Sequence, residues 1–91
     1  MRNPKRLAAI RKLPCIRCGN PHSQAAHSNN AKHGKGRSIK ASDEFTVPLC
    51  YSCHFQFDTF QLGNRVESEA MFDQWLVRVN RMLVMEDGEV F

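Results

Sequence analysis

The sequence predicts a small α+β domain in which a short strand pair and a helix close around a zinc ion, with a flanking helix at each end. Three observations predict it: two pairs of cysteines, two short segments of strand character, and an apolar stripe at helical spacing near the C-terminus. The chain has 91 residues, the size of one domain, and so small a core usually needs an added staple. With 42% hydrophobic and 24% charged residues, the composition is that of a globular protein and excludes a disordered tail.

The first predicted element is a short basic helix over residues 4–13. Asn3 is a typical helix cap, and Pro4 suits the first helical position. Pro14 ends the helix, because proline cannot continue it. We therefore assign residues 1–14 to a basic N-terminal helix of a single domain that spans the chain.

The middle of the chain predicts a strand, a long loop, a second strand and a helix. Residues 23–27 and 45–49 have strand character, and the residues between them, 28–42, are rich in Gly, Lys, Asn and Ser. Residues 50–60 have helical character. Together these elements form the predicted core region, residues 15–62.

The last predicted element is a long amphipathic helix over residues 66–86, in a C-terminal packing region that covers residues 66–87. Its apolar stripe is expected to cover the strands rather than to bind a partner. The stripe consists of Phe72, Leu76, Val79 and Leu83. The remaining apolar side chains leave a homodimer interface open, formed by Val77, Val84 and Met85.

Charge is distributed unevenly along the chain, although the net charge is only +4. Residues 1–42 contain ten Lys or Arg and no acid, whereas residues 43–91 contain three Lys or Arg and nine acids. The strong positive charge of residues 1–42 is typical of a surface that binds nucleic-acid phosphates, although it could also belong to a solvated face. DNA is thus the expected partner. The expected contacts are Lys5, Arg6, Arg11, Lys32, Lys35, Arg37 and Lys40.

Membrane binding and export are not expected. No apolar run approaches the roughly 18 residues that span a bilayer, and the basic half lacks the apolar face of an interfacial helix. Residues 1–6 are basic but are not followed by the apolar segment of an export signal. The sequence therefore predicts a cytoplasmic protein whose thiols are reduced.

The cysteines form two pairs with the same spacing, Cys15-x-x-Cys18 and Cys50-x-x-Cys53. Two such pairs that converge give tetrahedral zinc coordination, and reduced thiols disfavour the alternative of two disulfides. Iron–sulfur ligation is a further alternative. Two knuckles around a strand pair favour a zinc-closed treble-clef arrangement, in which the metal joins distant parts of the chain and stabilises the fold.

A second group of polar residues lies beside the second cysteine pair. His54 follows that pair directly, and Asp58 comes four residues later, so both lie on one face of the predicted helix. An imidazole and a carboxylate so placed can bind one divalent cation, although they could also be an ordinary surface pair. His27 lies at the end of the first predicted strand, before the basic loop.

These residues belong to segments that carry a resemblance to a known family. The segments are Ala26–His27, Gly34–Gly36 with Lys40–Asp43, Val47–His54, Asp58 and the tail Met82–Val90. With them the sequence resembles the HNH, or ββα-metal, nuclease group over about residues 14–90. Within the group it is most similar to small phage and prophage nucleases of the YbcO type, and more distantly to Ref-type phage nucleases.

The resemblance implies a ββα-metal core and a role for each polar residue. His27 would be the general base that takes a proton from the attacking water. His54 and Asp58 would hold a catalytic Mg²⁺ or other divalent ion. Asp43 would fix the loop or orient His27. In a different register, His27 would instead be a metal ligand.

The sequence thus predicts a metal-dependent endonuclease of phage or prophage type that hydrolyses DNA phosphodiester bonds and contains structural zinc. Two other functions stay open. One is a non-catalytic zinc module of the same fold that binds DNA or a protein. The other is a small phage regulator that contacts a host protein through its acidic C-terminal half.

Overall fold

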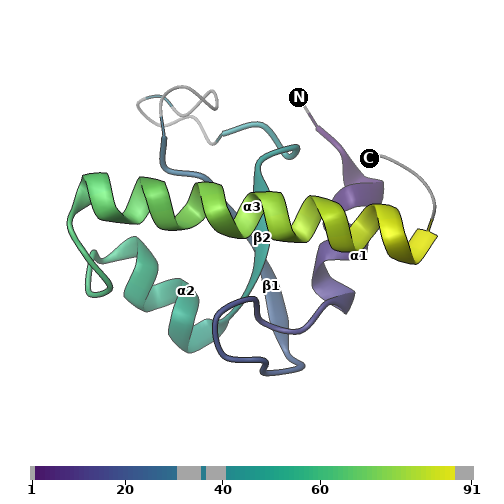
Figure 1. The fold of residues 1–91 in the computed structure, drawn as a ribbon, viewed down its shortest axis with the longest axis horizontal. Coiled ribbons are helices and arrows are strands. Elements are labelled where there is room, and N and C mark those ends of the chain that lie inside the picture. The colour runs from purple at the N-terminus through teal and green to yellow at the C-terminus, as the bar shows by residue number, and fades with distance from the viewer. Residues whose placement is uncertain (1, 31–35, 37–40, 88–91) are drawn as a thin grey trace.

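The computed structural model describes residues 2–30, 36 and 41–87, and within them it contains three helices and a two-stranded antiparallel sheet (Figure 1). The predicted α+β class is confirmed. In chain order the elements are α1 (Pro4–Lys12), β1 (Ser23–His27), β2 (Thr46–Cys50), α2 (Tyr51–Asp58) and α3 (Arg65–Asp87). None of the helices in this described part of the chain is long and apolar enough to span a membrane.

The element boundaries lie within two residues of those that the sequence predicts. β2 and α2 each begin one residue late, because Cys50 pairs with Ser23 in the sheet and then caps the helix with an extended backbone. α2 ends at Asp58, earlier than predicted. Shortly after it, Phe60 takes a left-handed backbone with φ of 58°, which a continuing helix does not allow.

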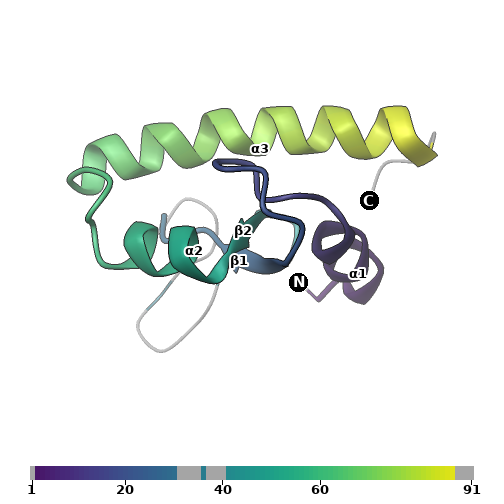
Figure 2. The same ribbon diagram turned by 90° about the horizontal axis from the view of Figure 1, so that it is seen from below.

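The five elements form two layers. α3 lies across one side of the strand pair as one layer, and α2, the strands and α1 form the other (Figures 1 and 2). At about 1.5 Å per residue, the 23 residues of α3 extend about 34 Å, and the longest dimension of the molecule is 34 Å. This single helix therefore runs the length of the molecule.

β2 is the centre of the packing, because each of the other four elements contacts it and all five of its residues are buried. Pro48 has no N–H for the sheet, but its carbonyl accepts a hydrogen bond from the N–H of Ile16, at 2.9 Å, in the loop after α1. That loop therefore lies directly against β2.

The hydrophobic core joins all the helices to the strands. Phe57 of α2 contacts Phe72 and Trp75 of α3, with both ring-centroid distances at 5.7 Å and tilted rings, a favourable geometry for aromatic pairs. The stripe predicted on the last helix is confirmed as core, because all four of its residues are buried. Val77 and Val84 are exposed on α3, and the side chain of Met85 lies outside the described residues, so the homodimer stays a prediction.

Arg6 on α1 is buried, with only 2% of its surface exposed. Its Nε and Nη2 donate to the hydroxyl and the carbonyl of Thr46 at 3.0 and 2.9 Å, and its Nη1 donates to Oδ1 of Asn80 at 2.8 Å. Burial lowers the pKa of the guanidinium, although the charge of Glu44 acts in the opposite direction. The prediction that Arg6 contacts DNA is therefore wrong, because this side chain ties α1 to β2 and α3.

Loss of this buried arginine is expected to destabilise the fold. Arg6→Ala removes three hydrogen bonds and leaves the partners on Thr46 and Asn80 without their donor. We expect the free energy of unfolding to fall by about 2–4 kcal/mol, against less than about 0.5 kcal/mol for Lys12→Ala at an exposed position of the same helix. Denaturant unfolding of both variants measures the difference, and equal stabilities would contradict the structural role.

Candidate functional site

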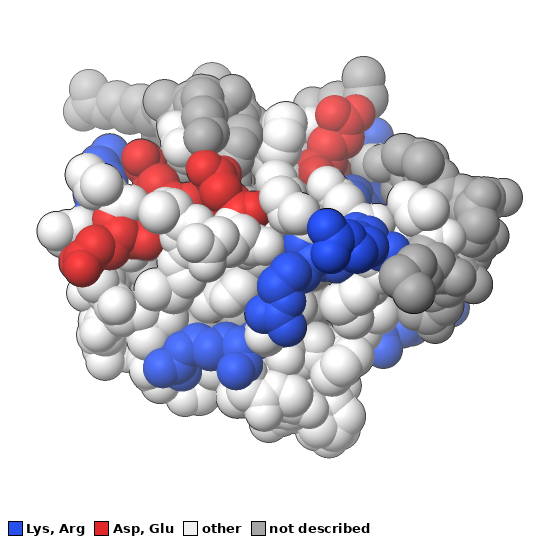
Figure 3. Space-filling view, in the orientation of Figure 1, with Lys and Arg blue, Asp and Glu red and all other residues white. Residues whose placement is uncertain are grey.

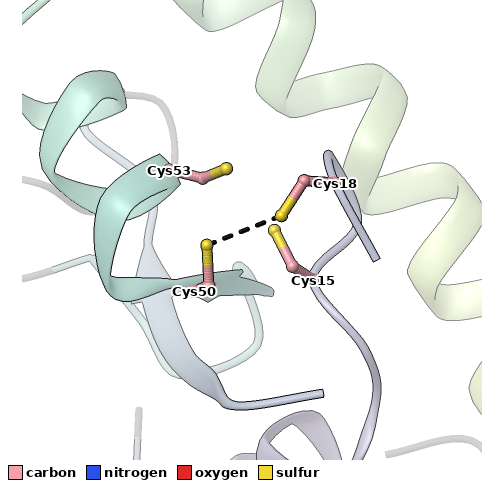
Figure 4. Close-up of side chains that lie close together, drawn as sticks. All are labelled: Cys15, Cys18, Cys50 and Cys53. Carbon is pink, nitrogen blue, oxygen red and sulfur yellow. Dashed lines mark hydrogen bonds between the residues drawn. The ribbon is translucent and has the colours of Figure 1, made fainter. Parts of the chain in front are cut away.

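The four cysteines converge between the loop after α1 and the start of α2 (Figure 4). Cys15 and Cys18 lie in that loop, Cys50 ends β2, and Cys53 lies in the first turn of α2. Their sulfur atoms all lie within 4.8 Å of one another, and the Sγ atoms of Cys18 and Cys50 are 3.6 Å apart. The convergence that the spacing predicts is confirmed.

The sulfur spacing suits a single metal ion. Zinc–sulfur bonds of about 2.3 Å in a tetrahedron place sulfur atoms about 3.8 Å apart. A disulfide needs about 2.05 Å between sulfurs, and all four cysteines are free. The cluster can therefore hold a metal ion with small movements of its side chains.

The loop that carries the first pair is shaped by a glycine. Gly19 has φ of 83°, in the left-handed region, and its N–H donates to the carbonyl of Cys15 at 2.8 Å. The N–H of Cys15 in turn donates to the carbonyl of Asn20 at 2.8 Å. These bonds curl the chain so that both sulfurs of the pair reach the same point.

The electrostatics of the cluster differ from one sulfur to the next. Burial raises the pKa of Cys15, but hydrogen bonds from the backbone of three neighbouring residues outweigh this and lower it to about 6. Burial raises the pKa of Cys53 to about 12, against a hydrogen bond from Nη1 of Arg17 at 3.5 Å. Four thiolates this close would repel one another, so a cation bound between them would supply the charge that lets all four ionise.

A pocket of about 630 Å³ gathers the other candidate residues. Its walls come from α1, β1, α2 and the segments beside the two strands. The polar side chains that line it and bear on its chemistry are Arg2, Arg11, His27, Asp43, His54 and Asp58. The structure thus brings together the four residues to which the resemblance assigns a catalytic role, His27, Asp43, His54 and Asp58.

His27 is held by Asp43. Nε2 of His27 lies 2.8 Å from Oδ1 of Asp43, and the second carboxylate oxygen accepts the backbone N–H of Asn3 at 2.8 Å. The hydrogen bond with His27, followed by that from Asn3, lowers the pKa of Asp43. Of the two roles expected for Asp43, this contact fits the orientation of His27.

His54 and Asp58 form a pair on the side of α2 that borders β1. Nε2 of His54 lies 3.2 Å from Oδ2 of Asp58, and Nδ1 of His54 lies 2.8 Å from Oε1 of Gln24 on β1. Oδ1 of Asp58 accepts a hydrogen bond from Nδ2 of Asn29 at 3.2 Å. No local pattern in the sequence identifies Gln24 or Asn29, because only the packing of β1 and the segment after it against α2 brings them to this pair.

The His27–Asp43 pair and the His54–Asp58 pair remain separate within the pocket. Within the described residues, the cysteines are the only cluster of three or more His, Cys, Asp or Glu that is close enough to hold a metal. His27 therefore does not join His54 and Asp58 as a third ligand, and its ring is engaged with Asp43 instead. This arrangement favours the role of base over that of ligand for His27.

The predicted DNA contacts fall into different places. Lys5 and Arg11 are exposed on α1, and Arg11 lines the pocket. Arg2, which is not among the expected DNA contacts, lines it as well. Four of the predicted contacts lie outside the described residues: Lys32, Lys35, Arg37 and Lys40. Arg11 is one of the expected DNA contacts, and the basic charge of residues 1–14 is the signal that could have pointed to Arg2 as well.

The surface that α3 forms carries both acidic and basic side chains. Figure 3 shows acidic side chains along the N-terminal half of α3, with basic side chains both at its N-terminal end and towards its C-terminal half. In the sequence of α3, Glu67, Glu69 and Asp73 lie between Arg65 and the later pair Arg78 and Arg81. The acidic half of the chain therefore does not form a uniformly acidic surface over the described part of this helix.

These features define a small α+β protein with a cluster of four cysteines that could hold a metal ion, beside a polar pocket that has two arginines in its wall. The chain matches the model of a family described as "Protein of unknown function (DUF968)" over residues 1–83, and it belongs to that family. No curated protein and no solved structure matches it.

Proposed function

We propose that this protein is a metal-dependent endonuclease of the HNH type that hydrolyses DNA phosphodiester bonds. The observation that carries the proposal is the single pocket that unites the His27–Asp43 pair, the His54–Asp58 pair and two arginines. A base, a possible ligand pair for a divalent ion, and cations for phosphate are what phosphodiester hydrolysis needs.

The proposal includes a zinc-closed treble-clef, or ββα-metal, architecture. The order of cysteine loop, strand pair and helix, with the metal cluster between loop and helix, supports it. Four thiolates within tetrahedral reach are the donor set of structural zinc sites, in which all coordination positions are filled by protein. The zinc would then hold the fold and leave the chemistry to the pocket.

In this proposal His27 takes a proton from the attacking water. Because Asp43 accepts from Nε2, the proton of the neutral ring stays on Nε2 and the lone pair lies on Nδ1. Nδ1 is then the atom that receives the proton of water. The carboxylate of Asp43 stabilises the imidazolium that forms, and its second oxygen keeps it anchored to Asn3.

His54 and Asp58 would hold a Mg²⁺ or similar ion, which supplies stabilisation of the negative charge that develops on the phosphate and the leaving oxygen. Gln24 accepts from Nδ1 of His54, so Nε2 is the ring nitrogen on the side of Asp58. Arg2 and Arg11 would bind the phosphate backbone through their guanidinium groups.

The second candidate function is a non-catalytic zinc module that binds DNA. The observation that favours it is the two-residue ligand set of His54 and Asp58, to which the described residues add no third His, Cys, Asp or Glu. Such a module would use the same arginines but would cut nothing.

Purified protein is expected to cut DNA only when Mg²⁺ or Mn²⁺ is added. Single-stranded, duplex and branched substrates are each incubated with and without the ion, and products are resolved by size. His54→Ala should lose activity and recover part of it with excess Mn²⁺, because mass action compensates for a lost ligand. His22→Ala, at an exposed position that does not line the pocket, serves as the matched control. If no substrate is cut with any ion, the binding module replaces the nuclease.

A further inference from the structure

Two aromatic side chains of α2 are exposed to solvent. Tyr51 is 74% exposed and Phe55 is 54% exposed. They are four residues apart, and so lie on one face of the helix. Neither belongs to the hydrophobic core, which α2 reaches instead through Cys53 and Phe57. The fold therefore does not require large aromatic rings at these two positions.

This aromatic pair shares its face with the candidate ligands. Positions 51, 54, 55 and 58 follow the spacing of a single helical face, so Tyr51 and Phe55 alternate with His54 and Asp58 along α2. When His54 is neutral, Asp58 is the only charged residue of α2, so the aromatic part of the face is uncharged. The face thus combines a polar pair with flat apolar surface.

A second pocket, of about 180 Å³, lies on this face. It is lined by Gln24, Tyr51, His54, Phe55 and Asp58, and it shares His54 and Asp58 with the larger pocket. The two pockets therefore meet at this pair. The larger one offers the cationic groups of Arg2 and Arg11, and the smaller one offers two aromatic rings.

We propose that Tyr51 and Phe55 form a stacking platform for an unpaired nucleobase beside the phosphate that the larger pocket binds. This inference rests on the proposed function and names its substrate class, which is single-stranded or locally unpaired DNA. Aromatic side chains stack on every base with little sequence preference. Bases inside a duplex already stack on their neighbours, so only an unpaired base can present its face to the platform.

Charge and shape together select this occupant. An apolar protein segment or a membrane would use the two rings but would offer no anionic group to the arginines on the other side of the His54–Asp58 pair. A nucleotide supplies a flat base and a phosphate within one unit, and the two adjoining pockets present a complementary group to each. The platform would also place the bond to be cut next to His54 and Asp58.

Binding of a fluorescently labelled single-stranded oligonucleotide, measured by anisotropy without added Mg²⁺ or Mn²⁺, tests the platform. Tyr51→Ala and Phe55→Ala should each weaken binding by about 5- to 100-fold. Tyr51→Phe should keep the affinity of the wild type, because the ring is retained. Val66→Ala, also at a 74% exposed apolar position but on α3, should have no effect. Zinc content and circular dichroism verify that each variant is folded.

An abasic strand of the same length separates stacking from phosphate contact. The wild type should bind this strand more weakly than the oligonucleotide, and Tyr51→Ala should bind the abasic strand as the wild type does. Unchanged affinity of both alanine variants for the oligonucleotide would overturn the platform. The nuclease would still stand in that case if the wild type cuts DNA. Platform-dependent binding by a wild type that cuts nothing would support the platform and overturn the nuclease.

Discussion

Removal of the metal from the four-cysteine cluster is expected to unfold the domain. Apparent zinc affinities of small structural sites are on the order of 10–16 kcal/mol, whereas whole domains are stable by only about 5–15 kcal/mol. The two cysteine pairs are separated by 31 residues, so a metal bound by both pairs would hold together parts of the chain that are distant in sequence. A core of this size cannot easily replace that contribution.

Elemental analysis of the purified protein should find one zinc per chain, and a chelator should abolish the cooperative thermal transition seen by circular dichroism. Cys50→Ser and Cys53→Ser should have the same effect without a chelator. Ser52→Ala changes one of the two exposed residues between these cysteines and should leave zinc content and melting unchanged. Metal-free protein that melts as before, or thiols that are oxidised in pairs, would contradict this prediction.

Metal retention should also depend on pH. The thiols must lose their protons to bind, and burial raises the pKa of Cys53 to about 12, so protons compete with the metal throughout the neutral range. Apparent affinity should therefore rise with pH and fall on acidification. A chelator titration at pH 6 and pH 8 compares the two conditions directly.

His27→Ala is expected to reduce cleavage by about 10²- to 10⁴-fold, the usual contribution of a general base. Zinc content should not change, because the ring of His27 is bonded to Asp43 and none of its observed contacts involves the cysteines. Excess Mn²⁺ should not restore activity, since it can compensate for a lost ligand but not for a lost base. Single-turnover cleavage measures the effect, with His22→Ala as control.

Asp43→Asn tests the support of the base. It keeps the size of the side chain but removes the charge that stabilises the imidazolium, so cleavage should fall while the fold persists. Because the pKa of Asp43 is lowered, its carboxylate contributes stability above its unfolded pKa, and loses it only as pH falls through the lower, folded pKa.

If His27→Ala cuts as well as the wild type, the nuclease proposal survives but the assigned base is wrong.

Much of the fold could be predicted because its strongest signals are local. The cap at Asn3, the cysteine spacing and the apolar period of the last helix each depend on a few neighbouring residues. The burial of Arg6 could not be read in this way. Arg6, Ile10 and Leu13 are all buried and follow the spacing of one helical face, but a charged residue is ordinarily assigned to solvent.

The candidate site was predicted only in part, for a similar reason. His54 and Asp58 could be paired in the sequence, because they are four residues apart on one helix. The contact of His27 with Asp43 spans 16 residues, and that of His54 with Gln24 spans 30. Such contacts depend on how the strand pair and the helices are arranged, which no local pattern in the sequence specifies.

The long helix α3 determines how the domain can unfold. Its residues Phe72 and Trp75 contact Phe57 on the side of α2, and its Asn80 holds Arg6 of α1. Neither α2 nor α1 can therefore move away from the strand pair without breaking its contacts with α3. Local opening of one side costs the packing of that side along α3, so we expect the described part of the chain to unfold as one cooperative unit, with both walls of the pocket lost together.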